Sequence, residues 1–368
     1  SEARIPGVTT RVDDDRPAAP VLRKLPFVVP RRDGLPPLSR YATFFGMRAD
    51  ERRQVGTIEA TRGCKHACRH CPVTAVYQGR FFVVPADVVV ADAEQQIAAG
   101  ARHLTFGDPD FLNGPGHTLK IARTIAAAHP DVSFDVTIKV EHIVAHPEHI
   151  RELGELGCAF VISAVESLSD EVLRRLAKGH DRADVMKAVA ICREAGVALR
   201  PSFVAFTPWT TLEDYIELVE WVIRDELVDH LEPIQLAIRL LVPPGSAMLW
   251  DEDTSWLGQL DREAFGYSWA HPDPRMDALF AEVSAIVETH EDARAALAAI
   301  RAAAYAQAGR FASALAMPAV RFVPHLSESW FCCAEPNQKQ LAATCGSADQ
   351  GATQLKPPSP SCGLPKNR

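Results

Sequence analysis

The stretch GTIEATRGCKHACRHC, residues 56–71, places a short strand directly before three closely spaced cysteines. Residues 56–61 predict the strand, and Cys64, Cys68 and Cys71 follow on the loop that leaves it. In folds built from parallel strands and helices, active sites form on the loops after the carboxyl ends of the strands. The stretch therefore predicts the first unit of an α/β fold and also the place of its site.

Strand-like and helix-like segments alternate about six times between residues 56 and 245. The predicted strands are 56–61, 102–107, 133–139, 158–164, 197–206 and 234–242, and the predicted helices are 85–99, 117–129, 147–156, 170–177, 184–195 and 212–224. Such alternation indicates a parallel sheet with right-handed crossovers. Six units are too few for an eight-fold barrel, so we expect an open, partial (β/α)6 barrel. Periodicity alone also allows a flat, doubly wound sheet.

The segments on either side of the barrel have a different composition. Residues 1–54 begin with seven prolines in the first 40 positions and predict an extended N-terminal arm, although simple disorder fits equally well. The barrel is assigned to residues 55–250. Residues 251–323 predict a helical C-terminal region, with helices at 276–289 and 293–308, and residues 324–368 form a cysteine-bearing tail.

Composition excludes several classes of protein. The 368 residues are 47% hydrophobic and 23% charged, which is enough to bury a core. The net charge of −8 argues against a large electrostatic binding surface for nucleic acid. No apolar run approaches the roughly 18 residues of a membrane span, and no signal peptide is visible. An odd count of nine cysteines, three of them within eight residues, predicts a cytoplasmic chain that uses thiolates as ligands rather than a secreted disulfide framework.

The spacing of Cys64, Cys68 and Cys71 is the most specific signal. Three thiolates on one loop can bind three irons of a [4Fe–4S] cluster and leave the fourth iron open for chemistry. The same thiolates with His66 or His70 would also make a structural zinc site. The zinc alternative does not explain the six strand–helix units that follow the loop.

With these units behind it, the CxxxCxxC loop resembles that of the radical S-adenosylmethionine (SAM) superfamily, over residues 55 to 245. The resemblance implies a [4Fe–4S] cluster on the three cysteines and SAM bound to the open iron. Reduction of the cluster would then cleave a carbon–sulfur bond of SAM. It also implies a small-molecule substrate and an external one-electron donor such as flavodoxin or ferredoxin.

The resemblance assigns candidate SAM contacts to the ends of the strands. Gly107 and Asp108 match the family's GGE-like motif for the SAM amino group, although GDP also suits an ordinary turn. The other candidates, for the SAM carboxylate or the ribose hydroxyls, are Lys139, Glu141, Glu166 and Arg200. Arg200 lies within a strand, where a charge needs a partner, and pairing between Arg200 and Glu166 is the structural alternative. Gln235 and Arg239 either face the substrate or lie on the surface.

The segment WFCCAEP, residues 330–336, carries the second cysteine signal. A disulfide between adjacent cysteines is strained, so Cys332 and Cys333 are interpreted as catalytic thiolates that meet a soft atom. The segment resembles the CUAEP or CCAEP tail of a radical SAM family, in which selenocysteine stands at the second place. Packing is the alternative role for both. Cys158 and Cys192 are predicted to be core residues, and Cys345 and Cys362 incidental.

The tail family is similar to radical SAM enzymes of organoarsenical antibiotic biosynthesis. That resemblance implies transfer of the 3-amino-3-carboxypropyl group of SAM to trivalent arsenic, held by Cys332 and Cys333, to build the skeleton of arsinothricin. Arsenite would then be the small-molecule substrate. Two alternatives stay open: hydrogen abstraction by a 5′-deoxyadenosyl radical from a metabolite or peptide, and a zinc- or metalloid-binding module without turnover.

Overall fold

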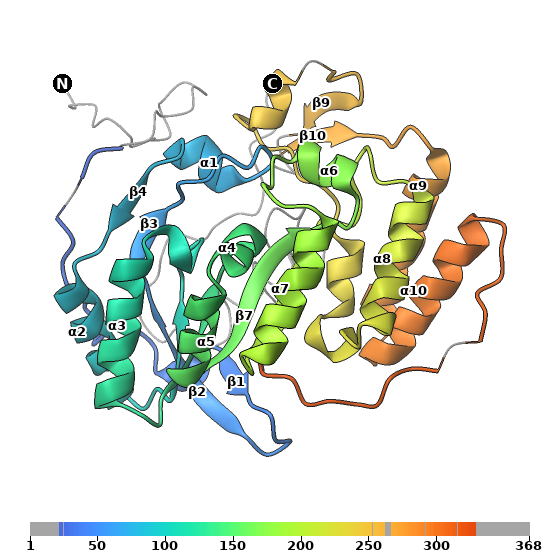
Figure 1. Cartoon of the computed structure of the whole chain (residues 1–368). Helices are drawn as coiled ribbons and strands as arrows, with labels where there is room; N and C mark the ends of the chain where they lie inside the picture. Colours follow the sequence, from blue (N-terminus) through green and yellow to red (C-terminus); the bar gives the residue numbers. More distant parts are fainter. Residues whose placement is uncertain are drawn as a thin grey trace, which may run out of the picture.

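A curled sheet with five parallel strands forms the centre of the protein (Figure 1). The computed structural model describes residues 22–328 except 25, 252, 262–265, 291 and 315. Across the sheet, the parallel strands are β2 (Arg52–Ile58), β5 (His103–Phe106), β6 (Ser133–Thr137), β7 (Cys158–Glu166) and β8 (Ala198–Phe203). They correspond to the first five predicted strands. The prediction of a partial radical SAM-type barrel is confirmed.

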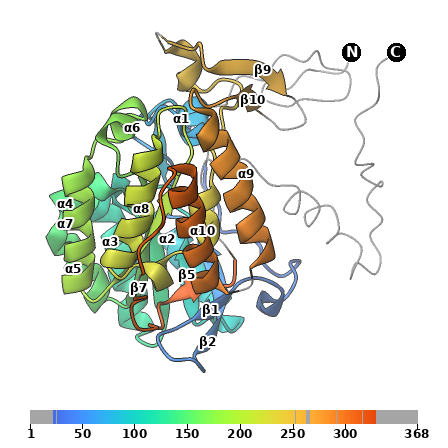
Figure 2. The same ribbon diagram turned by 90° about the vertical axis from the view of Figure 1, so that its right-hand side faces the viewer.

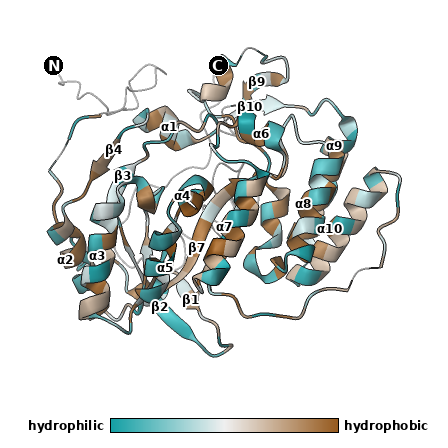
Figure 3. Cartoon of the chain, viewed as in Figure 1, coloured by the Kyte–Doolittle hydropathy of each residue, from teal (hydrophilic) through white to brown (hydrophobic). Residues whose placement is uncertain are grey.

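Helices cover the outer face of this sheet (Figure 1). The long ones are α2 (Ala86–Ala98), α3 (Pro115–Ala128), α5 (Pro147–Glu155), α7 (Arg182–Glu194) and α8 (Leu212–Arg224), as predicted within a few residues. Three further helices are short: α1 (Pro72–Tyr77), α4 (Val140–Ala145) and α6 (Asp170–Arg175). Of these, the sequence analysis predicted only α6. Figure 3 shows hydrophobic residues along β7 and hydrophilic residues on the outer faces of the helices, so the main core lies between these two layers.

The sixth predicted strand, 234–242, is wrong in its first half. Its first part is the 3-10 helix η4 (Pro233–Ala237). Pro233 has no backbone N–H to give to a ladder and a fixed φ that suits the first turn of a helix, which explains the change. The second part keeps one parallel bridge, between Phe206 and Arg239.

Two further strands come from the segments predicted as arm and tail. Strand β1 (Thr43–Phe45) pairs antiparallel with β2, and β11 (His325–Leu326) pairs antiparallel with β1. Strand β1 lies beside the amino-terminal end of β2, because Phe45 is opposite Arg52. Strand β11 lies on the other side of β1. The sheet therefore extends beyond residues 55–250, and its edge consists of chain from both flanks.

The C-terminal region contains the two predicted helices, α9 (Pro274–Thr289) and α10 (Ala293–Gln307). Figure 2 shows both beside α8, and α10 contacts α8 and α9. The region also contains a hairpin, β9 (Leu257–Asp261) and β10 (Gly266–Trp269), which the sequence analysis did not predict. A second hairpin, β3 (Thr61–Gly63) and β4 (Phe81–Val83), flanks the cysteine loop. Among the described residues, no helix has the length and apolar character that crossing a membrane requires.

Candidate functional site

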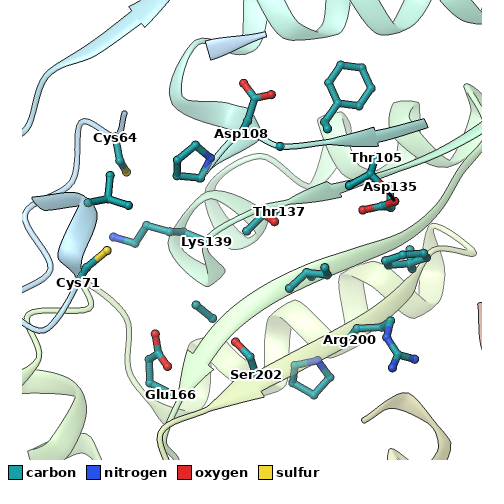
Figure 4. A pocket seen from close by; sticks show the side chains of 18 of the residues that line it. Cys64, Cys71, Thr105, Asp108, Asp135, Thr137, Lys139, Glu166, Arg200 and Ser202 are labelled. Atoms are coloured by element: carbon teal, nitrogen blue, oxygen red, sulfur yellow. Dashed lines mark hydrogen bonds between the residues drawn. The ribbon is translucent and has the colours of Figure 1, made fainter. Parts of the chain in front are cut away.

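One cavity of about 430 Å³ runs through the interior of the barrel. All three loop cysteines line the cavity, and Figure 4 shows Cys64 and Cys71 at one end and Arg200 at the other. Between the two ends the lining comes mainly from the inner faces and carboxyl ends of β5 to β8. A cavity with charged groups at strand ends is the usual place for a ligand in this class of fold.

The cysteine loop is fixed by backbone geometry on both sides. Gly63 has φ 86°, and a Cβ there would lie 2.6 Å from the carbonyl oxygen of Arg80, so only glycine fits before Cys64. The N–H of Arg69 donates to the carbonyl of Leu176 at 3.0 Å. Cys71 is the N-cap of α1, whose first residue is Pro72. The loop is therefore held in one conformation, with its cysteines on the cavity.

The thiols do not have the arrangement of a zinc site. Zinc–sulfur bonds of about 2.3 Å would bring four ligand atoms within about 3.8 Å of one another. Among the described residues, no group of ligand atoms within 4.8 Å combines these cysteines with His66 or His70. His70 Nε2 instead lies 3.1 Å from Glu166. Burial raises the pKa of the Cys64 and Cys68 thiols, so a bound metal would be needed to hold them as thiolates. A wider cluster fits this loop better than a single ion.

The GDP turn lies on the cavity, but its carboxylate already has protein partners. Asp108 accepts hydrogen bonds from the hydroxyl of Thr61 at 2.6 Å and from the N–H groups of Thr61 and Ala60. Burial raises the pKa of Asp108 to about 6 against these bonds. A Cβ at Gly107 would meet nothing closer than 3.6 Å, so packing within the protein does not require glycine there. Both residues line the cavity, and their assignment to the SAM amino group stays a prediction.

Lys139 lies at the cysteine end of the cavity, as Figure 4 shows. Its ammonium group donates to Glu141 at 2.9 Å and to Nδ1 of His66 at 3.1 Å. Burial would raise the pKa of Glu141, but Lys139 outweighs it and the pKa is lowered. Glu141 is outside the cavity lining and 43% exposed. The structure thus brings Lys139 to the candidate SAM site and places Glu141 behind it.

Glu166 is the centre of a buried charge cluster at the end of β7. Oε1 lies 3.1 Å from both Lys178 Nζ and His70 Nε2, whereas Oε2 is buried without a hydrogen-bond partner. Burial alone would raise the pKa of Glu166, but Lys178 and His70 lower it to about 2. An ionised, fully buried oxygen beside a cavity is suited to accept hydrogen bonds from ligand hydroxyls. This is the arrangement expected of a ribose contact.

Arg200 does not pair with Glu166, so the internal pairing considered from the sequence is absent. Its nearest described partners are the carbonyl of Pro324 at 3.5 Å and Glu232 at 3.7 Å. Burial lowers the pKa of Arg200. Figure 4 shows Arg200 at the far end of the cavity from Cys64 and Cys71. The structure thus separates Arg200 from Lys139, the other candidate for the SAM carboxylate.

Sequence reasoning missed the cluster behind the cysteine loop. The carboxylate of Asp110, fully buried, lies 2.8 Å from His142 Nδ1 and 3.2 Å from His66 Nε2. Lys178 was also missed, although it lines the cavity. For two of these residues the available signal was position: Asp110 lies on the loop after one predicted strand, and His142 lies in the first helical turn after another. Lys178 follows helix α6, so its position after a strand gave no signal.

The remaining predicted residues have mixed outcomes. Cys158 and Cys192 are buried in the core, as predicted, and burial raises the pKa of Cys192 to about 12. Gln235 lines the cavity. Arg239 does not line it, because it pairs with Asp277 of α9 at 2.9 Å. The remaining cysteine predictions lie outside the described residues: Cys332, Cys333, Cys345 and Cys362.

Comparisons with known proteins agree with the fold and the loop. Residues 58–222 match the family model described as the radical SAM superfamily. The ribosomal protein uS12 methylthiotransferase RimO of Trichlorobacter lovleyi is 24% identical over 180 residues, which cover 45% of this chain and 38% of that protein. The tRNA-2-methylthio-N(6)-dimethylallyladenosine synthase of Chlorobium luteolum is 29% identical over 183 residues, covering 44% and 38%.

Among solved structures, the cobalamin-dependent SAM radical enzyme OxsB with aqua-cobalamin bound matches with a TM-score of 0.53 and 13% identity. The match covers 68% of this chain and 46% of that one. At this identity the likeness concerns the fold alone. This chain spans less than half the length of the two curated relatives, so their activities do not transfer directly to it.

Proposed function

Since residues 58–222 form a radical SAM domain, we propose that this enzyme transfers a SAM-derived group to a small, soft acceptor. The cofactors of such a domain are a [4Fe–4S] cluster and SAM. A reduced cluster supplies the electron that breaks a carbon–sulfur bond of bound SAM. An external donor such as flavodoxin or ferredoxin would deliver that electron.

One observation carries this proposal: the three cysteines share a cavity with two buried lysines and with an ionised Glu166 that has one oxygen without a hydrogen-bond partner. Cys64, Cys68 and Cys71 would hold three irons of the cluster. Lys139 and Lys178 place positive charge beside the cysteines, where the SAM carboxylate would lie. Glu166 Oε2 is available to accept hydrogen bonds from the ribose hydroxyls.

The specific acceptor we propose is trivalent arsenic, which would receive the 3-amino-3-carboxypropyl group. The bond between the sulfur of SAM and the γ-carbon of that group would break, and 5′-methylthioadenosine would be the leaving group. The resemblance of residues 332–336 to the CCAEP tail supports it, since trivalent arsenic binds soft thiolates. A second support is that Glu328 lines the cavity, and Cys332 follows it by at most about 14 Å of extended chain. Cys332 and Cys333 would hold the arsenic for transfer.

The test is product analysis with the full chain. The protein is reconstituted without oxygen, reduced with dithionite and given SAM with and without arsenite, and the products are identified by mass spectrometry. We expect a 3-amino-3-carboxypropyl–arsenic product that forms only with arsenite and is lost in the Cys332→Ser, Cys333→Ser double variant. The matched control is Cys158→Ser, because Cys158 is a core thiol away from the cavity.

The relatives favour a second candidate, a methylthio or methyl transfer. The names of both curated relatives describe methylthiolation, of a ribosomal protein and of a tRNA nucleoside. In the same assay this reaction would release 5′-deoxyadenosine and methionine, with yields unaffected by arsenite. That outcome would discard the arsenic acceptor and keep the radical SAM activity. No cleavage of SAM by protein with a full cluster would overturn both candidates.

A further inference from the structure

The half of the cavity away from the cysteines contains two buried charges of opposite sign. Asp135 of β6 is 1% exposed, and the side chain of Arg200 of β8 is 14% exposed. Figure 4 shows both side chains at the end of the cavity opposite Cys64 and Cys71. A buried ion is costly unless the protein or a ligand compensates it. Each charge has an ionisable partner among the described residues, His103 at 2.8 Å from Asp135 and Glu232 at 3.7 Å from Arg200.

Asp135 is held rigidly and has one oxygen left over. Its Oδ1 lies 2.8 Å from His103 Nε2 and accepts from the hydroxyl of Thr105 at 2.7 Å. His103 is fixed in turn, by Ser133 at 2.7 Å and by stacking on Phe44. No hydrogen bond from the described residues reaches Oδ2. The carboxylate is thus positioned to accept from a donor in the cavity.

Arg200 has unused donors on the facing strand. The guanidinium group has five N–H donors, and its described contacts, at 3.5 Å and 3.7 Å, are at or beyond the limit of a hydrogen bond. Ser202 lies two residues further along β8, on the same face, and lines the cavity. Its hydroxyl is buried without a partner. Together, Arg200 and Ser202 make a receptor for an oxyanion.

Neither charge is needed at the SAM end of the cavity. Lys139 and Lys178 already place two cations beside the cysteines, where the SAM carboxylate would lie under the proposed function. Strands β6 and β8 are separated by β7 alone, so two strand spacings, about 10 Å, lie between their backbones. The side chains of Asp135 and Arg200 extend into the space between these two strands, so the distance left between their charged groups suits a small molecule. A ligand with only one charge would engage either the second oxygen of Asp135 or the guanidinium group of Arg200, and would leave the other without a ligand partner.

We propose that this half of the cavity binds a small zwitterion of the amino acid class. Asp135 takes its ammonium group, and Arg200 with Ser202 takes its carboxylate. The proposal goes beyond the proposed function and rests on it only in that SAM occupies the cysteine end. It adds a recognition site for a second amino acid-like molecule, whichever atom of that molecule reacts.

The test uses three probes: L-norvaline, which carries both charges, pentanoate, which is norvaline without its amino group, and butylamine, which is norvaline without its carboxylate. Anaerobic calorimetry is done on the reconstituted full chain with its cluster oxidised and SAM at saturation, so that the cysteine end is filled. We expect norvaline to bind at least tenfold more tightly than either single-charge probe. Asp135→Asn and Arg200→Gln should each weaken norvaline binding at least tenfold and change the SAM dissociation constant less than twofold.

Lys139→Gln is the matched control, since it removes a buried charge from the other end of the cavity. It should weaken SAM binding and leave norvaline binding unchanged once SAM is saturating. If Asp135→Asn does not fold, the comparison of Arg200→Gln with Arg200→Lys decides, because only the lysine variant retains the charge. The proposal is overturned if norvaline has no advantage over the single-charge probes, or if Arg200→Gln weakens SAM binding tenfold. SAM cleavage by the wild-type chain is measured separately, so a failure of the proposed function is distinguishable.

Discussion

Glu166 combines three properties that together indicate ligand binding rather than structure. It has a left-handed backbone, with φ 68°, which is uncommon for a residue with a side chain. It is buried and ionised, with Lys178 and His70 on one oxygen and nothing on the other. Backbone strain and an unpaired buried oxygen both cost stability. Their coincidence at one residue is explained if the second oxygen meets a bound ligand.

This argument predicts the effect of Glu166→Gln on SAM binding. The amide keeps the shape but removes the charge that strengthens hydrogen bonds to ligand hydroxyls. We expect the SAM dissociation constant to rise roughly 10- to 100-fold, the equivalent of about 1.5–3 kcal/mol for a bond to a charged group. Equilibrium binding to protein of measured iron content is the readout. Glu171→Gln, which changes an exposed carboxylate on α6, is the control. An unchanged SAM affinity in Glu166→Gln would remove this residue from the SAM site.

Asp108 predicts a pH dependence of folding. Its pKa is raised by burial from an ordinary 3.8 to about 6, so between these values the folded chain binds more protons than the unfolded chain. Stability from this group is therefore full below about pH 4 and is lost as the pH rises through 6. The shift corresponds to at most about 3 kcal/mol. Asp108→Asn does not titrate, so the difference in unfolding free energy, wild type minus variant, should fall between pH 4 and pH 7. Urea unfolding of the SAM-free protein measures it, and parallel pH profiles would contradict the assignment.

At the residue scale, the sequence predicts ligands better than it predicts their partners. Cys64, Cys68 and Cys71 are adjacent in sequence, and their spacing is visible in one loop. Asp110 and His142 reach the same region from two different strand ends and Lys178 reaches it from the connection after α6, and only the fold brings them together. For Asp108 the sequence predicted a ligand contact but not the protein partners that occupy its carboxylate. Its motif predicts a ligand contact, yet its hydrogen bonds to Thr61 and Ala60 depend on a turn that the pattern does not reveal.

At the element scale, two helices provide a matched pair of N-caps. Thr211 begins α8 with a complete capping box, in which its side chain accepts from Asp214 N–H and Asp214 accepts in return. Ser169 begins α6, but its side chain makes no capping hydrogen bond. Serine and threonine are both favoured N-cap residues, so residue type alone does not decide whether a cap forms.

The pair predicts different costs for the same kind of substitution. Thr211→Ala should lower the unfolding free energy by about 1 kcal/mol, with a range of about 0.5–2, because an N–H of α8 loses its acceptor. Ser169→Ala should cost less than about 0.5 kcal/mol. Urea unfolding at neutral pH gives both values. Equal costs would mean that the difference in capping geometry has no energetic consequence.

The same scale explains which elements the sequence identified. Helix α8 carries a strong 3.6-residue period and was predicted with its exact bounds, since its apolar face has to meet the sheet. The other long helices that cover the sheet were predicted within a few residues. Residues 234–242 have an apolar run that suits a strand, but Pro233 starts a 3-10 helix in front of it. Strand β11 has two residues, too few for any periodicity. Its place in the sheet depends on β1, which lies about 280 residues away in sequence.

At the scale of the whole molecule, chain from both flanks closes the end of the barrel opposite the cysteines. Phe44 of β1 is 2% exposed and stacks on His103, with ring centroids 4.1 Å apart. It also stacks with Phe160 of β7 at 6.5 Å. The stacked rings of Phe44, His103 and Phe160 stabilise the fold. Because His103 also contacts Asp135, they hold the polar end of the cavity in place as well. The segments predicted as arm and tail are therefore part of the barrel's stability.

This arrangement predicts that Phe44 contributes far more than its neighbour. Phe44→Ala should lower the unfolding free energy by about 3–5 kcal/mol, the usual cost of removing a buried aromatic ring. Phe45→Ala is the matched control, since Phe45 lies on the opposite face of the same strand, only partly buried against His325, and should cost about 1 kcal/mol or less. Urea unfolding of the cluster-free chain measures both free energies. The iron content after reconstitution shows whether the cysteine end of the cavity still binds a cluster in each variant. If β1 were an appended arm rather than part of the barrel, both variants would unfold at the wild-type midpoint.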